Sequence, residues 1–246
     1  VILPYSRSPA LHPPGGGALA FIHQCLNNSD LRTVIPHMES NTSFITPQPS
    51  EPGVETHPWQ PFIPDNARVL FLGTFPPPPS RWSMPFYYPN RNNDFWRVMG
   101  IVFYDNPDRF YDSAAKSFRL DDITAFATER GIALCDTGRR IRRLRGNASD
   151  AFLEIVEAID LQSLIPLMPH LRAVASTGTL AAKVIASLTD TTVPPIGGHT
   201  QTQLITPAAG TSLQLWRMPS TSRAYPMKLE LKARAYHELF SSLNLI

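Results

Sequence analysis

Residues 87–96, which read YYPNRNNDFW, place four aromatic side chains and three asparagines within ten positions. Aromatic rings stack on the face of a planar ligand while amides hydrogen-bond to its edge, so this composition suits a ligand such as a nucleobase. In an alternative interpretation, Asn93 or Asp94 caps the helix that follows, and Phe95 and Trp96 enter the core. Capping does not account for so many polar groups in one loop, and we therefore expect a binding segment.

Arginine occupies five of the seven positions from 139 to 145, in a chain whose 22 basic and 20 acidic residues leave a net charge of only +2. These residues are Arg139, Arg140, Arg142, Arg143 and Arg145. A solvated charged surface normally mixes both signs, but no acid follows this run until Asp150. The run therefore predicts a local positive field that contacts phosphate groups.

Two further segments combine small polar residues with glycine or proline. Residues 218–225 (MPSTSRAY) contain Ser220, Thr221 and Ser222, whose hydroxyls and backbone amides can hold a phosphate, with Arg223 beside them. A helix-capping turn is the alternative interpretation of this segment. Residues 73–77 (GTFPP) predict a tight turn followed by a stiff extended backbone, and the alternative here is a rigid surface loop.

The elements that must position these segments are short strands alternating with helices. Four apolar strands are expected at residues 68–72 (RVLFL), 132–136 (IALCD), 172–176 (RAVAS) and 213–218 (LQLWRM). Apolar residues at helical spacing predict a helix over residues 152–159, beginning at Asp150 with Ser149 as its N-cap, and another over residues 229–243. Ligands of an open parallel sheet bind beyond the carboxyl ends of its strands, which is where polar segments follow the strands.

Composition restricts the class of protein. With 246 residues and 43% hydrophobic content, the chain is expected to form one α/β domain. Its two cysteines, Cys25 and Cys135, indicate neither a disulfide framework nor a metal cage, and they exclude a cluster held by four cysteines. The apolar runs are shorter than the roughly 18 residues that cross a bilayer, and no signal segment is recognisable, so we expect a cytoplasmic protein and no membrane partner.

The first 58 residues contain nine prolines and a run of three glycines, without usable periodicity. We therefore expect residues 1–58 to be a disordered leader and residues 59–246 to be the catalytic domain. Because the first methionine is Met38, the biological start is expected there or near Val54.

Taken in order, these segments resemble the uracil-DNA glycosylase superfamily over about residues 67–240, particularly its mismatch-specific and hypoxanthine-DNA glycosylase branches. GTFPP is similar to the family's first motif, a Gly-x-x-Pro-Gly loop, and residues 87–96 are similar to a stretch that ends in Asn-x-Phe-Trp. RGNASD at 145–150 resembles a Gly-Ser-x-Asp turn of the branch. MPSTSRAY resembles the second motif, a Pro-Ser-x-Ser loop that enters the minor groove and pinches the backbone.

The resemblance implies a three-layer α/β/α sandwich with a central four-stranded parallel sheet. It also implies an enzyme of base excision repair that flips a deaminated base, uracil or hypoxanthine, out of DNA and hydrolyses its N-glycosidic bond. Neither a metal nor a cofactor is implied, and the expected partner is DNA with a damaged base. A monomer is expected, because an enzyme that acts on one lesion needs no second subunit.

One departure from the family pattern changes the expected catalytic residue. The third position of the first motif often carries a catalytic Asn or Asp, but here it is Phe75, which neither orients nor activates water. In the hypoxanthine branch the catalytic Asn is the one in Asn-x-Phe-Trp, and that position here is Asn93. Phe95 is then expected to stack on the base, and the backbone amides near Gly73 and Thr74 to hold its carbonyl oxygen.

The end of the third strand carries a second departure. The family commonly offers an Asn there to read a pyrimidine edge, whereas this chain has Thr177, which puts uracil as the preferred base in question. Two other functions remain open. A hydrolase of free nucleosides would not need five clustered arginines, and a protein that binds damaged DNA without cutting it would be consistent with Phe75.

Overall fold

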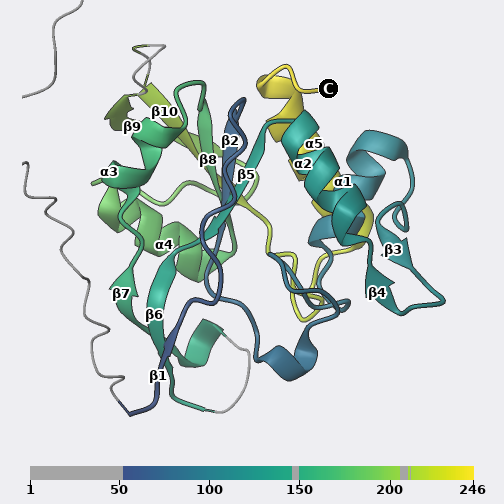
Figure 1. Cartoon of the computed structure of the whole chain (residues 1–246). Coiled ribbons are helices and arrows are strands. Elements are labelled where there is room, and N and C mark those ends of the chain that lie inside the picture. Colours follow the sequence, from purple (N-terminus) through teal and green to yellow (C-terminus); the bar gives the residue numbers. More distant parts are fainter. Residues whose placement is uncertain (1–51, 146–149, 206–209, 211) are drawn as a thin grey trace, which may run out of the picture. The chain divides into compact units, whose positions relative to one another are not determined.

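A five-stranded sheet forms the centre of the described fold, with its strands in the order β5-β2-β8-β10-β9 (Figure 1). The structure is a computed structural model that describes residues 52–145, 150–205, 210 and 212–246, all within one unit, Pro49–Ile246. The strands of this sheet are β2 (Val69–Gly73), β5 (Ile132–Asp136), β8 (Ala173–Thr177), β9 (His199–Ile205) and β10 (Ser212–Met218).

Four of these strands match the predicted ones to within one residue at each end, and β5, β2, β8 and β10 run parallel. The predicted four-stranded parallel sheet is nevertheless wrong for the sheet as a whole, because β9 joins it antiparallel to β10. β9 reads HTQTQLI, and only its Thr202 is buried. Such an edge strand lacks the apolar run on which the strand predictions depended.

Helices cover both faces of the sheet, which gives three layers (Figure 1). α1 (Phe95–Tyr104), α2 (Leu120–Glu129) and α5 (Leu229–Ser242) pack on one face, where Val69 and Phe71 of β2 join their core. α3 (Leu161–Leu164) and α4 (Thr179–Leu188) pack on the other, against Leu70 and Leu72. β2 is therefore buried on both sides, as expected of a central strand between two helical layers. The helix predicted over residues 229–243 is confirmed as α5.

A second, three-stranded antiparallel sheet contains β1 (Val54–Thr56), β6 (Gly138–Arg143) and β7 (Leu153–Ala158), in the order β1-β6-β7. The helix predicted over residues 152–159 is wrong, because one 3₁₀ turn, η2 (Asp150–Phe152), leads directly into β7. Pairing with β6 overrides the helical spacing, since Ile155 lies opposite the buried Ile141. The predicted cap, Ser149, lies outside the described residues.

The remaining elements are short. A hairpin, β3 (Tyr111–Asp112) and β4 (Ser117–Phe118), precedes α2, and the 3₁₀ turns η1 (Pro79–Arg81) and η3 (Ile165–Leu167) lie in connections. β1 pairs with β6, so ordered structure in this unit begins before residue 59, where the predicted catalytic domain starts.

Candidate functional site

A cavity of about 580 Å³ opens where the parallel strands end; we call it the strand-end cavity. Gly73 at the end of β2, Asp136 at the end of β5 and Thr177 at the end of β8 all line it. The turn that follows β10 closes another side with Ser220, Thr221 and Ser222. The site therefore lies where ligands of open α/β sheets bind, at the carboxyl ends of the strands.

The strand-end cavity brings together residues from most of the segments singled out in the sequence. Its lining includes Gly73, Thr74 and Phe75 from the first segment, Asn93 from the second, Thr177, and Ser220, Thr221 and Ser222 from the last. Phe95, Arg223 and the five clustered arginines are not among the lining residues. These seven side chains therefore do not form the wall of the cavity.

Gly73 allows the first loop to approach the end of the neighbouring strand. A Cβ atom at this position would collide with Oδ1 of Asp136 and lie 3.6 Å from the Tyr88 hydroxyl. Phe75 follows in the same loop, with its ring 5.2 Å from the His57 ring in an edge arrangement. Phe75 thus contributes an apolar wall at the position where the family motif often has an amide or a carboxylate.

Among the described residues, the side-chain amide of Asn93 forms a hydrogen bond through its oxygen but not through its nitrogen. Its Oδ1 accepts a hydrogen bond of 2.9 Å from the backbone N–H of Phe95, the first residue of α1, which satisfies one of the free helix N–H groups. Its Nδ2 makes no hydrogen bond to any other residue in the described ranges. The half-buried Asn93 lines the strand-end cavity, and its backbone bridges to Ser222 of the last segment.

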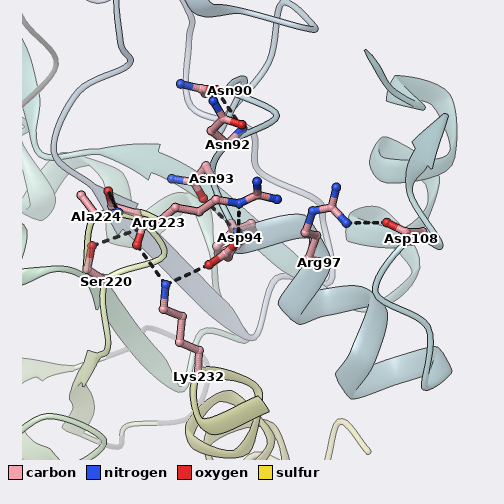
Figure 2. Close-up of polar contacts among 12 residues, drawn as sticks. Asn90, Asn92, Asn93, Asp94, Arg97, Asp108, Ser220, Arg223, Ala224 and Lys232 are labelled. Atoms are coloured by element: carbon pink, nitrogen blue, oxygen red, sulfur yellow. Dashed lines mark hydrogen bonds and ion pairs between the residues drawn. The ribbon is translucent and has the colours of Figure 1, made fainter. Parts of the chain in front are cut away.

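Asp94 joins the second and last segments through a buried ion pair (Figure 2). Its carboxylate accepts 2.9 Å from Nζ of Lys232 and 3.1 Å from Nε of Arg223, and its backbone N–H donates 2.7 Å to Thr221 O. Lys232 is only 1% exposed and also donates 2.9 Å to the backbone oxygen of Ser222. Arg223 therefore anchors its own loop to Asp94, in addition to any role with phosphate.

Phe95 does not lie where base stacking would place it. The residue is fully buried, and the ring of Tyr88 stacks on it at a centroid distance of 3.8 Å. Tyr88 itself lines the strand-end cavity, as do the aromatic residues Phe75 and Tyr225, and the Tyr88 hydroxyl lies 2.9 Å from Oγ1 of Thr177. Burial raises the pKa of Tyr88 well above its ordinary value, so the hydroxyl stays protonated. We therefore correct the expectation for Phe95 and place it beneath the site as a support for Tyr88.

Two carboxylates in the strand-end cavity were not among the site residues expected from the sequence. Asp136 is 7% exposed, and its Oδ2 lies 2.9 Å from Nε2 of His57, whose Nδ1 lies 2.8 Å from Trp59 O. The only sequence signal for Asp136 was a polar residue at the end of an apolar strand. No spacing rule connects it with His57, which lies 79 positions away.

Asp150 is the second of these carboxylates. The residue as a whole is exposed, but its carboxyl group is largely desolvated and accepts a 3.0 Å hydrogen bond from Oγ1 of Thr74. Burial raises its pKa, the hydrogen bond from Thr74 and the charge of Arg143 oppose the shift, and the nearby Asp136 adds to it. A carboxylate with a raised pKa in a cavity is a candidate for accepting a proton or orienting water.

The arginine run lies on β6, and in space it faces acids that the sequence order concealed. Three of its members form ion pairs with glutamates of the neighbouring strands β1 and β7. These pairs are Arg140–Glu157 at 3.9 Å, Arg142–Glu154 at 2.8 Å and Arg143–Glu55 at 2.8 Å. The Arg140 and Arg142 pairs are partly exposed and contribute little stability, whereas the Arg143 side chain is buried and also donates to Pro76 O. The contact of these arginines with phosphate stays a prediction.

The other two arginines of the run, Arg139 and Arg145, have different surroundings. Cζ of Arg145 lies 4.1 Å from the centre of the Phe152 ring, and Arg139 is half-buried.

Among the described residues, no group of three His, Cys, Asp or Glu side chains could hold a metal ion. The helices of the described ranges are all too short or too polar to cross a membrane.

Comparison with solved structures identifies a similar fold. A candidate uracil DNA glycosylase from Methanosarcina acetivorans, solved by NMR, matches with a TM-score of 0.52 and 18% identity, over 78% of this chain and 99% of that chain. The two chains share one fold. No family model and no curated protein sequence matches the chain. The α/β fold expected from the resemblance is thereby supported.

Proposed function

We propose that this protein is a monofunctional DNA glycosylase, closest to the hypoxanthine and mismatch-specific branches, which excises a deaminated base from DNA. The observation that carries the proposal is the strand-end cavity, because residues of the four motif-like segments line one space at the strand ends. Asn93 and Tyr88 both line this space. The shared fold of the Methanosarcina protein supports the same function.

The chemistry would begin when the damaged nucleotide leaves the DNA stack. Flipping costs a few kcal/mol, and contacts to the DNA backbone offset this cost. We assign those contacts to Ser220, Thr221 and Ser222, with Arg223 close by, and to the arginines of β6. A base in the cavity would lie against Tyr88, with the backbone amides near Gly73 and Thr74 at its carbonyl oxygen.

Bond cleavage then requires stabilisation of opposite charges on the two fragments. The sugar develops oxocarbenium character, while the base departs as an anion. We assign Nδ2 of Asn93 as the hydrogen-bond donor that stabilises the departing base. Asp150, held by Thr74, would orient the water that attacks the sugar and offset its positive charge.

The test is an excision assay with the full chain. Duplex and single-stranded oligonucleotides carrying uracil, hypoxanthine or xanthine are incubated with the protein, and alkali-labile abasic sites are counted beside a binding measurement. We expect abasic sites with at least one deaminated base, and more from hypoxanthine than from uracil because Thr177 replaces the pyrimidine-reading Asn. Binding without abasic sites would instead indicate a damage-binding protein, the alternative that Phe75 favours, and release of bases from free nucleosides would indicate a nucleoside hydrolase.

A further inference from the structure

A second cavity, of about 650 Å³, lies beside the strand-end cavity; we call it the hairpin cavity. Arg81, Asn90 and Asn92 line both cavities, so the two adjoin each other. Arg91 and Lys116 add two more cations to the hairpin cavity, and no acidic residue lines it. Its charge is therefore positive throughout, unlike that of the arginine run on β6.

The three cations of the hairpin cavity have no acidic partner in the described part of the chain. Arg81, Arg91 and Lys116 are all exposed, and none forms an ion pair with a residue in those ranges. The nearest hairpin acid, Asp112, instead accepts backbone hydrogen bonds from Ala114 and Ala115, at 2.9 and 3.0 Å. Cations that the fold leaves uncompensated in one concave surface are suited to an external anion.

The walls of the hairpin cavity are held in place by one hydrogen bond between distant segments and two within the loop before α1. Oγ of Ser117, in β4, donates to the backbone oxygen of Ser83, which ties the β3–β4 hairpin to the loop before α1. Nε1 of Trp82 donates 2.7 Å to Pro77 O, and Oγ of Ser83 donates 2.8 Å to Pro89 O. The cations are thus carried on a backbone that is ordered before any ligand binds, which lowers the entropic cost of binding.

We propose that the hairpin cavity binds the sugar–phosphate backbone of the damaged strand next to the flipped nucleotide. This inference rests on the proposed function, because the strand can enter the hairpin cavity only if its damaged nucleotide occupies the strand-end cavity. A flipped nucleotide stays covalently joined to its neighbours, so the strand must pass over the edge of the strand-end cavity, and the hairpin cavity adjoins that edge. Arginine and lysine side chains with nearby serine and asparagine groups are the usual partners of phosphate oxygens.

The test compares two double variants of equal charge. Arg91→Gln/Lys116→Gln removes two cations from the hairpin cavity, and the matched control Lys183→Gln/Arg234→Gln removes two exposed cations that line neither cavity. Binding of a lesion-containing duplex is measured between 50 and 200 mM salt. Each lost phosphate contact lowers the salt slope by about 0.9, so the cavity variant should lose about 12-fold less affinity than the wild type over this range. The control should match the wild type.

A second arm identifies the strand. Single phosphates on either side of the lesion are replaced by neutral methylphosphonates, on the damaged or the opposite strand. We expect one or two positions on the damaged strand where neutralisation weakens binding by the wild type and the control, but no longer weakens binding by the cavity variant. Additive effects at every position, coupling only with the opposite strand, or a salt slope equal to that of the control would overturn the inference.

Failure of the inference is distinguishable from failure of the proposed function. Excision by the wild-type protein is measured on the same duplexes. If the wild type excises the base and no phosphate couples to Arg91 and Lys116, only the inference fails. If the wild type forms no abasic sites, the proposed function fails, whatever the coupling shows.

Discussion

Substitutions of Asn93 can separate its two roles, because Oδ1 of the amide supports α1, whereas Nδ2 is the proposed donor to the base. Asn93→Ala removes both Oδ1, which accepts from Phe95 N–H, and Nδ2. Losing this hydrogen bond costs about 1 kcal/mol, which in a domain of this size lowers Tm by about 2–4 °C. Losing one preorganised polar contact in the transition state lowers turnover by about 10²-fold or more.

Asn93→Ser is the matched control, because a serine hydroxyl also accepts a hydrogen bond from the backbone N–H two residues on but lacks the amide donor. We expect Asn93→Ser to keep a Tm close to that of the wild type and to lose excision as severely as Asn93→Ala. The assay is single-turnover excision with protein in excess over the duplex, read as abasic sites, beside thermal unfolding of each variant. Near-normal excision by Asn93→Ser would refute the catalytic assignment. Loss of excision in Asn93→Ala alone would mean that Asn93 acts only by supporting α1.

Three further predictions concern buried groups at the site. Lys232→Met leaves the Asp94 carboxylate without its buried partner and should lower the free energy of unfolding in urea by about 3–5 kcal/mol, while a loss below 1 kcal/mol would contradict a buried ion pair. If ionised Asp150 orients water, the excision rate should fall as the pH drops through the pKa of Asp150, which burial raises above the ordinary aspartate value. Asp150→Asn should be slow at every pH and should lack this fall in rate at acidic pH. A variant with the same rate–pH profile as the wild type would contradict the role. Gly73→Ala should lower both Tm and excision, because its Cβ would collide with Asp136, and a variant with normal values of both would show that the loop can yield.

The strands were predictable because burial on both faces of a sheet leaves an unbroken apolar run. Residues 132–136 illustrate this, since every position of β5 is buried and its predicted bounds are those observed. β7 was not predictable in the same way. Its apolar residues repeat at helical spacing, and its pairing with β6, in which Ile155 lies opposite Ile141, selects a strand. β9 was missed because an edge strand carries mostly polar residues.

The candidate site was predictable in its motifs but not in its long-range partners. Asn93 and Gly73 could be selected from the sequence, because each lies in a segment with an unusual local composition. The partners of Asp94 and Asp136 could not be, since Lys232 and His57 lie 138 and 79 positions away from them. Nothing in the local sequence distinguishes a lysine that a fold buries against a carboxylate from one that extends into solvent.

The contact between His57 and Asp136 has a consequence for engineering the protein. A recombinant version shortened to residues 59–246 would keep every motif of the resemblance to glycosylases. It would nevertheless lose β1, and it would leave the carboxylate of Asp136 buried without its imidazole partner. A version that keeps the support of Asp136 must therefore include His57, and expression boundaries drawn from motif coverage alone would remove it.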